Sequence, residues 1–417
     1  MDILVCDDER PRYESTRARI KERADVNVAP LVGCDLACAL TALFDGVAAL
    51  LDNGGGLGAL DNKRFEGFDV VVVDNNLTGL DLKGARMTAE TIIGYLRAFT
   101  DIPYIISLNK NPHVDFDLRY LIGDYQSMAD LALNTEHLSN ACLWGRRDGS
   151  GFAPWYWPQL ENAAGRRREQ IEFLSDKLTV PVWVALEFPP EAEEYLSFRA
   201  RAALSSGEGN IRGVPFKSFF RASRVLTPAE LRSLEGLAER GEEWAHRAIC
   251  RVAAYEVDRW LRRDVLGAQD VLIDVPHLVA QMPIVLGERQ GELDAWNRAA
   301  NESRAPFALG QGMFADHLRE ACFSASAWVP VPCFWWPKLR ANRTLSKLFF
   351  DSDVQWPDAV FCEDVSGFVP VTGLGDGGPP LEFESEIDGS WSRRFVRDVD
   401  GYQYSPRSRI VGRASGA

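Results

Sequence analysis

The N-terminal third of the chain is expected to be an α/β domain with a doubly wound parallel sheet, followed by a mostly helical or α+β region. Apolar runs rich in β-branched residues, such as 70–73, alternate there with longer segments of helical composition, which predicts parallel strands joined by helices. Tryptophan marks the division, since only Trp144 of the twelve tryptophans lies within the first 150 residues. We therefore expect a domain over 1–148 and a Trp-rich region of one or two subdomains over 149–417.

The composition is that of an ordinary globular protein. Hydrophobic residues make up 46% and charged residues 25%, which excludes a disordered tail protein and a collagen-like chain. Eight cysteines without paired metal-ligand spacing, and a start that lacks the basic stretch of a signal peptide, predict a cytoplasmic protein with reduced thiols. No apolar run approaches the roughly 18 residues of a membrane span, so we expect no membrane contact. The net charge of −14 disfavours broad nucleic-acid binding.

Local patterns predict each element of the first domain in turn. Residues 2–6 form a short apolar run that stops at acidic residues, as is typical of a buried strand. Residues 36–51 have helical composition and end at the glycines 54–56. The valine-rich run 68–74 suits a central parallel strand that is buried on both faces. The expected order is strand 2–6, helix 11–24, helix 36–51, strand 68–74, helix 84–99, strand 104–107 and strand 129–133.

Polar side chains are expected at the ends of three of these strands. Asp7 and Asp8 follow the first strand, Asp74 ends the second and Ser107 ends the third. The carboxyl ends of parallel strands meet at one edge of the sheet, where ligands bind. Three carboxylates at that edge repel one another unless a hard cation neutralises them, and Mg²⁺ suits a few carboxylate oxygens with water. A single Asp after a strand is more often a turn or cap residue, but this set predicts a Mg²⁺ site.

Three segments together resemble the receiver domain of two-component response regulators. They are ILVCDDE at 3–9, FDVVVVDNNLTG at 68–79 and YIISLNK at 104–110. The resemblance covers roughly residues 1–145 and implies a flavodoxin-like fold. The roles that it implies are Asp74 as phosphoacceptor, Asp7 and Asp8 as the acidic Mg²⁺ pair, Asn76 as the residue whose main-chain carbonyl completes the metal site, and Ser107 as the hydroxyl residue that moves toward the phosphoryl group.

The chemistry implied by this resemblance is transfer of a phosphoryl group from a histidine kinase to a carboxylate. The new phosphate then attracts the Ser107 hydroxyl and biases a two-state loop. The sequence departs from the family at the fifth strand, where receivers carry a lysine and this chain continues into Asn134. Lys110, three residues after Ser107, is the candidate substitute. A degenerate receiver that serves as a scaffold is therefore an alternative.

The C-terminal region begins a helix at Thr227, where Pro228 and Glu230 complete a capping box. A second helix is expected over 242–264, and the apolar segment 180–186 is expected to be a strand or extended. Two adjacent helices in a regulator raise the hypothesis of a DNA-binding transcriptional response regulator. The arginines concerned do not fall on one helix face, so a packed helical hairpin is favoured: Arg247, Arg251, Arg259, Arg262 and Arg263.

A further alternative is a C-terminal enzyme under receiver control. Its candidate residues are His277, the i, i+3 pair His317 and Glu320, and the acids Glu363 and Asp364. A lone histidine in an apolar segment is more often a hydrogen-bonded core residue, and no nucleophile, zinc, kinase or phosphate-loop motif accompanies it. The Trp- and Pro-rich patch 328–337 suits a protein interface. We therefore expect a receiver-like signalling protein whose output is a protein interaction.

Overall fold

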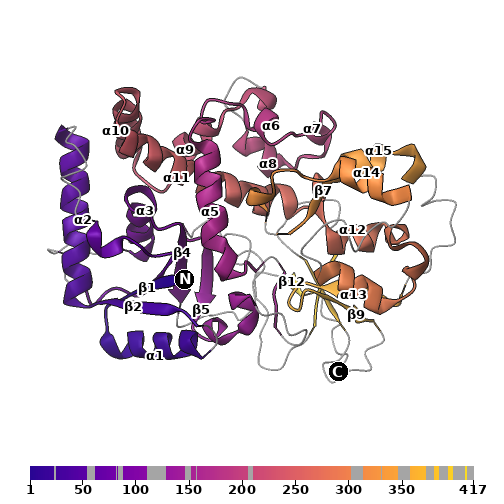
Figure 1. Ribbon diagram of the computed structural model, residues 1–417, viewed down its shortest axis with the longest axis horizontal. Helices are drawn as coiled ribbons and strands as arrows, with labels where there is room; N and C mark the ends of the chain where they lie inside the picture. Colours follow the sequence, from indigo (N-terminus) through magenta and orange to yellow (C-terminus); the bar gives the residue numbers. More distant parts are fainter. Residues whose placement is uncertain are drawn as a thin grey trace.

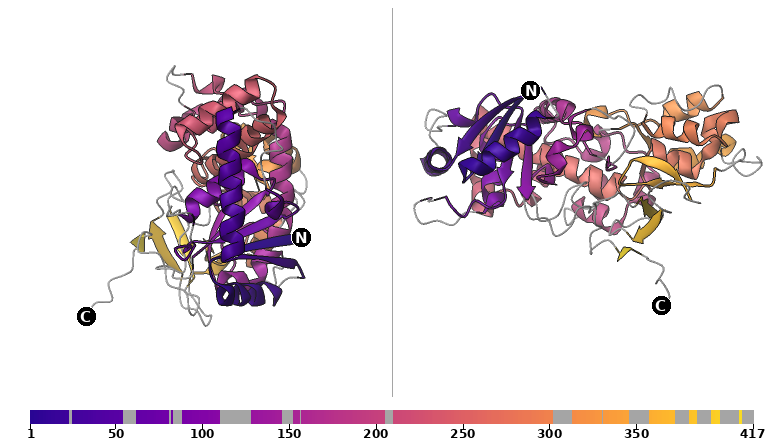
Figure 2. Two further views of the ribbon diagram at one scale, coloured as in Figure 1. Left: turned by 90° about the vertical axis from the view of Figure 1, so that its left-hand side faces the viewer. Right: turned by 90° about the horizontal axis from the view of Figure 1, so that it is seen from below.

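The computed structural model describes the following parts of the chain: residues 1–22, 25–53, 62–80, 82, 88–109, 128–145, 152–155, 157–204, 210–301, 313–329, 331–345, 357–371, 380–384, 393–397 and 409–410. The molecule is elongated, with the N-terminal sheet at one end and the last helices and strands at the other (Figures 1 and 2). The expected boundary near residue 148 falls in the segment 146–151, outside the described residues.

A five-stranded parallel sheet forms the N-terminal part. Its strand order is β2-β1-β3-β4-β5, and every neighbouring pair is parallel. The four valines 70–73 are buried without exposed area, because a central strand of such a sheet is covered on both faces. The strands are β1 (Asp2–Asp7), β2 (Asn27–Val32), β3 (Val70–Asp74), β4 (Tyr104–Asn109) and β5 (Leu131–Asn134). The predicted α/β class of this part is confirmed.

Helices cover both faces of this sheet. The helix α1 (Arg10–Lys21) lies on one face and α3 (Ala89–Phe99) on the other (Figure 1). Thr88 caps α3 by accepting the Thr91 N–H through its hydroxyl. The first residues of the predicted helix, 84–87, are outside the described part.

The helix α2 (Cys34–Asn53) corrects the expectation about apolar runs. Its 18-residue stretch Cys34–Leu51 is long and apolar enough to cross a membrane by length and composition. One stripe of this helix is fully buried against the rest of the protein, which is the packing of an amphipathic core helix. The stripe consists of Leu36, Leu40, Leu43, Val47 and Leu50.

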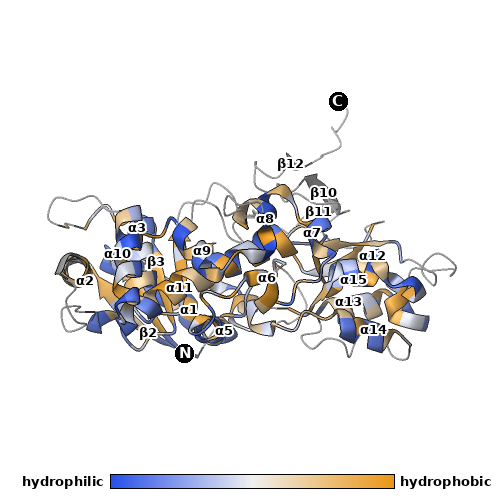
Figure 3. Ribbon diagram, turned by 90° about the horizontal axis from the view of Figure 1, so that it is seen from above, coloured by the Kyte–Doolittle hydropathy of each residue, from blue (hydrophilic) through white to orange (hydrophobic). Residues whose placement is uncertain are grey.

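The C-terminal region is largely helical. Its central helix, α11 (Glu243–Trp260), packs against α3 of the N-terminal part and against three C-terminal helices. In Figure 3, hydrophobic residues gather along the middle of the molecule, where α11 runs. The other helices are α5 (Leu160–Leu174), α6 (Val182–Ala185), α7 (Ala192–Tyr195), α8 (Phe198–Ala203), α9 (Phe216–Ala222), α10 (Pro228–Glu239), α12 (Val275–Gln281), α13 (Leu293–Asn301), α14 (Met313–Ala321) and α15 (Trp336–Ala341).

Two small sheets complete the fold. The strands β6 (Leu272–Asp274) and β7 (Cys333–Trp335) form an antiparallel pair. A mixed sheet has the order β12-β10-β11-β8-β9. Its strands are β8 (Ala359–Cys362), β9 (Gly367–Pro370), β10 (Leu381–Glu384), β11 (Arg393–Val396) and β12 (Arg409–Ile410).

The two parts share one hydrophobic core. Buried apolar side chains form a single cluster that extends from Ile3 in β1 to Val396 in β11. The predicted helices after Thr227 are confirmed, including the reciprocal capping box with Glu230. The expected strand at 180–186 is wrong, because its middle residues form the short helix α6.

Candidate functional site

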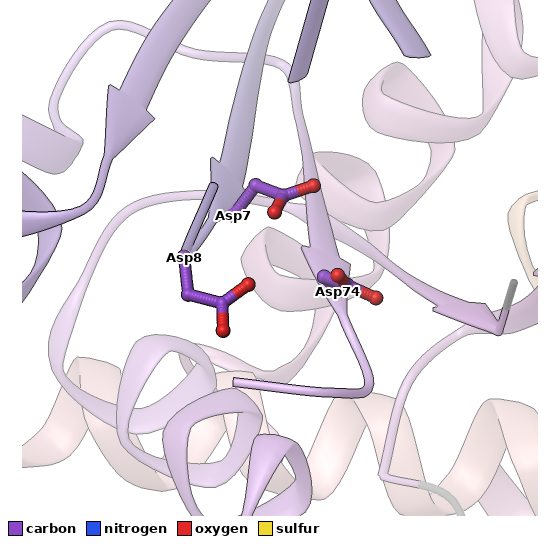
Figure 4. A group of neighbouring side chains, drawn as sticks. All are labelled: Asp7, Asp8 and Asp74. Atoms are coloured by element: carbon purple, nitrogen blue, oxygen red, sulfur yellow. The ribbon is translucent and has the colours of Figure 1, made fainter. Parts of the chain in front are cut away.

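Three carboxylates meet at the carboxyl edge of the parallel sheet (Figure 4). Asp7 ends β1, Asp8 follows it, and Asp74 ends β3. The two strands are neighbours, with Cys6 opposite Val73, so their ends lie side by side. One oxygen from each carboxylate can be chosen so that all three lie within 4.8 Å of one another. The predicted convergence of these three side chains is therefore present.

The cluster occupies the place where the strand order reverses. The chain passes from β1 to β2 on one side and later returns to β3 on the other side of β1. Ligands of open parallel sheets bind at such a switch point, because the connecting loops separate there. The carboxylates are well covered: Asp7 is 1% exposed, Asp74 is 2% exposed, and the side chain of Asp8 is 4% exposed.

Backbone N–H groups hold one oxygen of each carboxylate, which fixes the orientation of all three side chains. The donors are the N–H of Glu9 to Asp7 Oδ1 (3.0 Å), the N–H of Gly79 to Asp8 Oδ2 (2.9 Å) and the N–H of Asn76 to Asp74 Oδ1 (3.4 Å).

Gly79 is required by this arrangement. A Cβ atom at this position would lie 2.5 Å from Asp8 Oδ2, closer than real Cβ contacts occur. Any larger residue must therefore displace the Asp8 carboxylate or the loop that carries the N–H donor.

Arg12 supplies the positive charge beside the cluster. It belongs to the first turn of α1, and its Nη1 lies 3.4 Å from Asp8 Oδ1 and 3.8 Å from Asp74 Oδ2. Its Nε lies 3.0 Å from Glu9 Oε2. The side chain of Arg12 is 33% exposed, so it lies between the buried carboxylates and the solvent. Arg12 was not among the predicted site residues, although it lies four residues after Asp8, a spacing that brings side chains together at the start of a helix.

The donor set fits Mg²⁺. This ion binds oxygen at about 2.1 Å, so two ligands on opposite sides of it are about 4.2 Å apart, and small side-chain rotations reach that geometry from the observed spacing. Magnesium also prefers carboxylate oxygens and retains several waters. Asp7, Asp8 and Asp74 would hold such an ion, and the Arg12 guanidinium lies beside the carboxylates of Asp8 and Asp74.

Ser107 lies inside β4, because the strand continues two residues beyond its expected end. Its hydroxyl donates to Oδ1 of Asn75 at 2.7 Å. In the register of β3 and β4, Asp74 lies opposite Leu108, and successive side chains point to opposite faces of the sheet. The Ser107 hydroxyl contacts Asn75, the residue after Asp74. A role of Ser107 in phosphoryl transfer stays a prediction.

The remaining expected site residues lie nearby or outside the described part. Asn76 lies two residues after Asp74, and its side-chain oxygen accepts the Thr78 hydroxyl at 2.8 Å. Lys110 lies outside the described residues. The last residue of β5, Asn134, accepts the N–H of His137 at 2.8 Å through its side chain. A local turn therefore occupies the strand end at which the receiver resemblance implies a lysine.

The arginines of the DNA-binding hypothesis do not form an exposed basic face. Most of them form ion pairs at short range, and Arg262 is only 5% exposed. The pairs are Arg251 with Asp101 (2.8 Å), Arg259 with Glu256 (2.9 Å), Arg262 with Asp258 (2.7 Å) and Arg263 with Asp264 (2.6 Å), while Arg247 lies 3.9 Å from Asp101.

The candidate residues of the enzyme hypothesis are brought together only in part. His277 Nδ1 lies 2.5 Å from Asp274 Oδ1, and its Nε2 lies 3.2 Å from Glu363 Oε1. All three are at most 1% exposed, as expected for a hydrogen-bonded core histidine. His317 and Glu320 lie on another helix, α14, where the histidine contacts Asn342. The sequence analysis missed Asp274, three residues before His277.

No known protein-family model, curated protein or solved structure matches the chain.

Proposed function

We propose that the protein is a cytoplasmic, response-regulator-like signalling protein whose N-terminal domain is a receiver. In this proposal Asp7, Asp8 and Asp74 bind Mg²⁺, Asp74 accepts a phosphoryl group, and the modification controls a protein-interaction output of the C-terminal region. The observation that carries the proposal is the convergence of three oriented carboxylates at the switch point of the sheet. The strand order 2-1-3-4-5 is also that of flavodoxin-like sheets, which include receivers.

The proposed reaction is a single displacement at phosphorus. A carboxylate oxygen of Asp74 forms a bond to the phosphorus atom while the P–N bond of a phosphohistidine donor breaks, and the released imidazole takes up a proton. Mg²⁺, when bound, neutralises charge on the transferring oxygens. The N–H of Asn76 holds the other Asp74 oxygen, so the nucleophilic oxygen keeps a fixed direction. Burial of Asp74 keeps water from the acyl phosphate that forms.

The C-terminal helices contact the sheet on the side of α3, β4 and β5, which supports a direct effect on the output region. The hydroxyl of Tyr95 in α3 donates to Glu230 in α10 at 2.5 Å. Arg251 in α11 donates to the Ala98 carbonyl at 2.7 Å and pairs with Asp101. A shift of α3 or β4 is therefore transmitted to helices of the other part without a linker.

A degenerate receiver is the second candidate function, and two observations favour it. Arg12 already contacts two of the three carboxylates, and β5 ends in Asn134 rather than in a lysine. In that case the acidic edge is a scaffold for partner binding and accepts no phosphoryl group.

Labelling with a small phosphodonor separates the two candidates. We expect incubation with acetyl phosphate and Mg²⁺ to add one phosphoryl group to the intact mass of the wild type and none to Asp74→Asn. Asp69→Asn is the matched control, because Asp69 begins the same strand region and pairs with Arg168 away from the cluster. No adduct on the wild type, also with a histidine kinase as donor, would contradict the proposal and favour the scaffold.

A further inference from the structure

A half-open cavity of about 20 Å³ lies where the N-terminal sheet meets the C-terminal helices. Its walls come from Tyr104 at the start of β4, from α5, from the end of α11, and from the turn Ser326–Trp328. Tyr104 pairs with Val70, the first residue of β3, so the cavity lies at the opposite end of the strands from Asp74. It is a different place from the carboxylate cluster.

Several buried polar atoms on the wall have no hydrogen-bond partner within the described structure. Three kinds of donor are involved: the Nε and Nη1 groups of Arg167, the hydroxyl of Tyr104 and the indole Nε1 of Trp328. Arg167 is 3% exposed and Trp328 is 1% exposed, so bulk water does not satisfy these groups. Buried donors without partners are unfavourable and uncommon, and several on one wall indicate an acceptor bound between them.

A network of buried charges lies beside the cavity. Three guanidinium groups share two carboxylates. Nη2 of Arg167 lies 2.7 Å from Asp130 and 3.2 Å from Asp258, Nη2 of Arg97 lies 3.0 Å from Asp130, and Nη2 of Arg262 lies 2.7 Å from Asp258. A further guanidinium, that of the half-buried Arg166, also lines the cavity.

Asp258 and Arg167 are ionised at neutral pH. Burial alone raises the pKa of Asp258, but the adjacent Arg262 and Arg167 outweigh it and lower that pKa below its ordinary value. Burial alone lowers the pKa of Arg167. The negative charges of Asp130 and Asp258 outweigh this effect, so the pKa of Arg167 lies above its ordinary value. Arg167 is therefore positively charged in the folded protein.

We propose that this cavity binds hydrogen phosphate, held by Arg167, Tyr104 and Trp328. The unpartnered wall atoms are mostly donors, and an oxyanion provides acceptors for them together with negative charge, whereas water carries no charge and supplies donors as well as acceptors. The small volume suits a single tetrahedral group and excludes a larger organic molecule from the interior. The side-chain oxygen of Gln170 also lines the cavity without a donor, and the P–OH group of hydrogen phosphate supplies that donor. Sulfate, which carries no proton at neutral pH, leaves it unpaired.

The test is calorimetric titration of the full chain with sodium phosphate and sodium sulfate at pH 7, at matched ionic strength. EDTA is included, so that no metal bound by the Asp74 cluster contributes. We expect saturable binding of phosphate, with sulfate at least about tenfold weaker because of the unpaired Gln170 oxygen. No saturable binding of phosphate, or sulfate binding as tight as phosphate, would overturn the proposal.

Two variants locate the site and one serves as the matched control. Tyr104→Phe and Trp328→Phe each remove a donor to the anion, and each should weaken phosphate binding about tenfold. Trp244→Phe removes an equally buried, unpartnered indole N–H that does not line the cavity, and should leave the affinity unchanged. Equal weakening in all three variants would show a loss of packing and contradict the assignment.

Thermal unfolding separates the effect of the substitution on the stability of the fold from its effect on phosphate binding. Without phosphate, Tyr104→Phe loses an unpartnered hydroxyl, so its Tm should equal or exceed that of the wild type. With phosphate, its Tm should rise less than that of the wild type. A lower Tm without phosphate and an equal rise with phosphate would contradict the proposal.

Titration with adenosine monophosphate distinguishes a free phosphate ion from the phosphate group of a larger ligand. Tighter binding of this monoester than of phosphate would identify the cavity as the phosphate subsite of a larger ligand at its open side. Equal or weaker binding would identify the free ion as the ligand.

Discussion

At the scale of single residues, Gly79 and Arg12 matter at the acidic edge as much as the carboxylates. The sequence predicted the meeting of Asp7, Asp8 and Asp74, because strand ends of a parallel sheet share an edge. Gly79 was not predictable in the same way, since its contact with Asp8 spans 71 residues and depends on the path of a loop. Arg12 carried a local signal in its four-residue spacing from Asp8.

Asp364 leads to a prediction on the pH dependence of stability. Burial raises its pKa from 3.8 to about 7, and the adjacent Glu363 adds to this effect. Between these values the folded chain keeps a proton that the unfolded chain has lost, so the free energy of unfolding falls as the pH rises from about 4 to about 7. Asp364→Asn has no such proton, and at pH 8 it should be more stable than the wild type by ~1–4 kcal/mol.

Urea denaturation at pH 5 and pH 8 measures this effect. The variant should gain little at pH 5 and most at pH 8, while the exposed Asp358→Asn should change neither value. A lower stability of Asp364→Asn at pH 8 would mean that the ionised carboxylate, which accepts the Arg397 N–H at 2.8 Å, stabilises the fold.

At the scale of elements, hydrophobic pattern and capping signals predicted most of the N-terminal sheet and the helix after Thr227. The strand β2 was missed because Pro30 breaks its pattern. The sheet accepts this proline because β2 is an edge strand, where a missing N–H is tolerated. The segment 180–186 was assigned wrongly because Val182 and Trp183 are buried in a single helical turn, so tertiary packing overrides propensity.

The cap of α10 can be tested directly. The Thr227 hydroxyl accepts the N–H of Glu230, and the Glu230 carboxylate accepts the N–H of Thr227. Thr227→Ala removes one half of this box and should lower the free energy of unfolding by about 1 kcal/mol. Denaturant titration beside Thr179→Ala, an exposed threonine in a turn, provides the comparison. Equal stability of the two variants would show that the cap contributes nothing measurable.

At the scale of the whole molecule, the two parts that composition separates are joined by a common core and a buried ion network. Asp130 precedes β5, and its carboxylate contacts Arg97 of α3 and Arg167 of α5. Such a network depends on residues far apart in the sequence, so tryptophan content and charge could not predict it. The N-terminal part is therefore packed directly against the region that it is proposed to control.

Calorimetric titration with MgCl₂ tests most directly whether the acidic edge is a metal site. We predict saturable binding of one Mg²⁺ to the wild type and loss of binding in Asp8→Asn. Gly79→Ala keeps all three carboxylates and displaces one, so its affinity should fall about 10–100-fold, as for other residues that orient metal ligands. Absence of Mg²⁺ binding to the wild type, or equal binding by all three proteins, would contradict the account and leave Arg12 as the partner of these carboxylates.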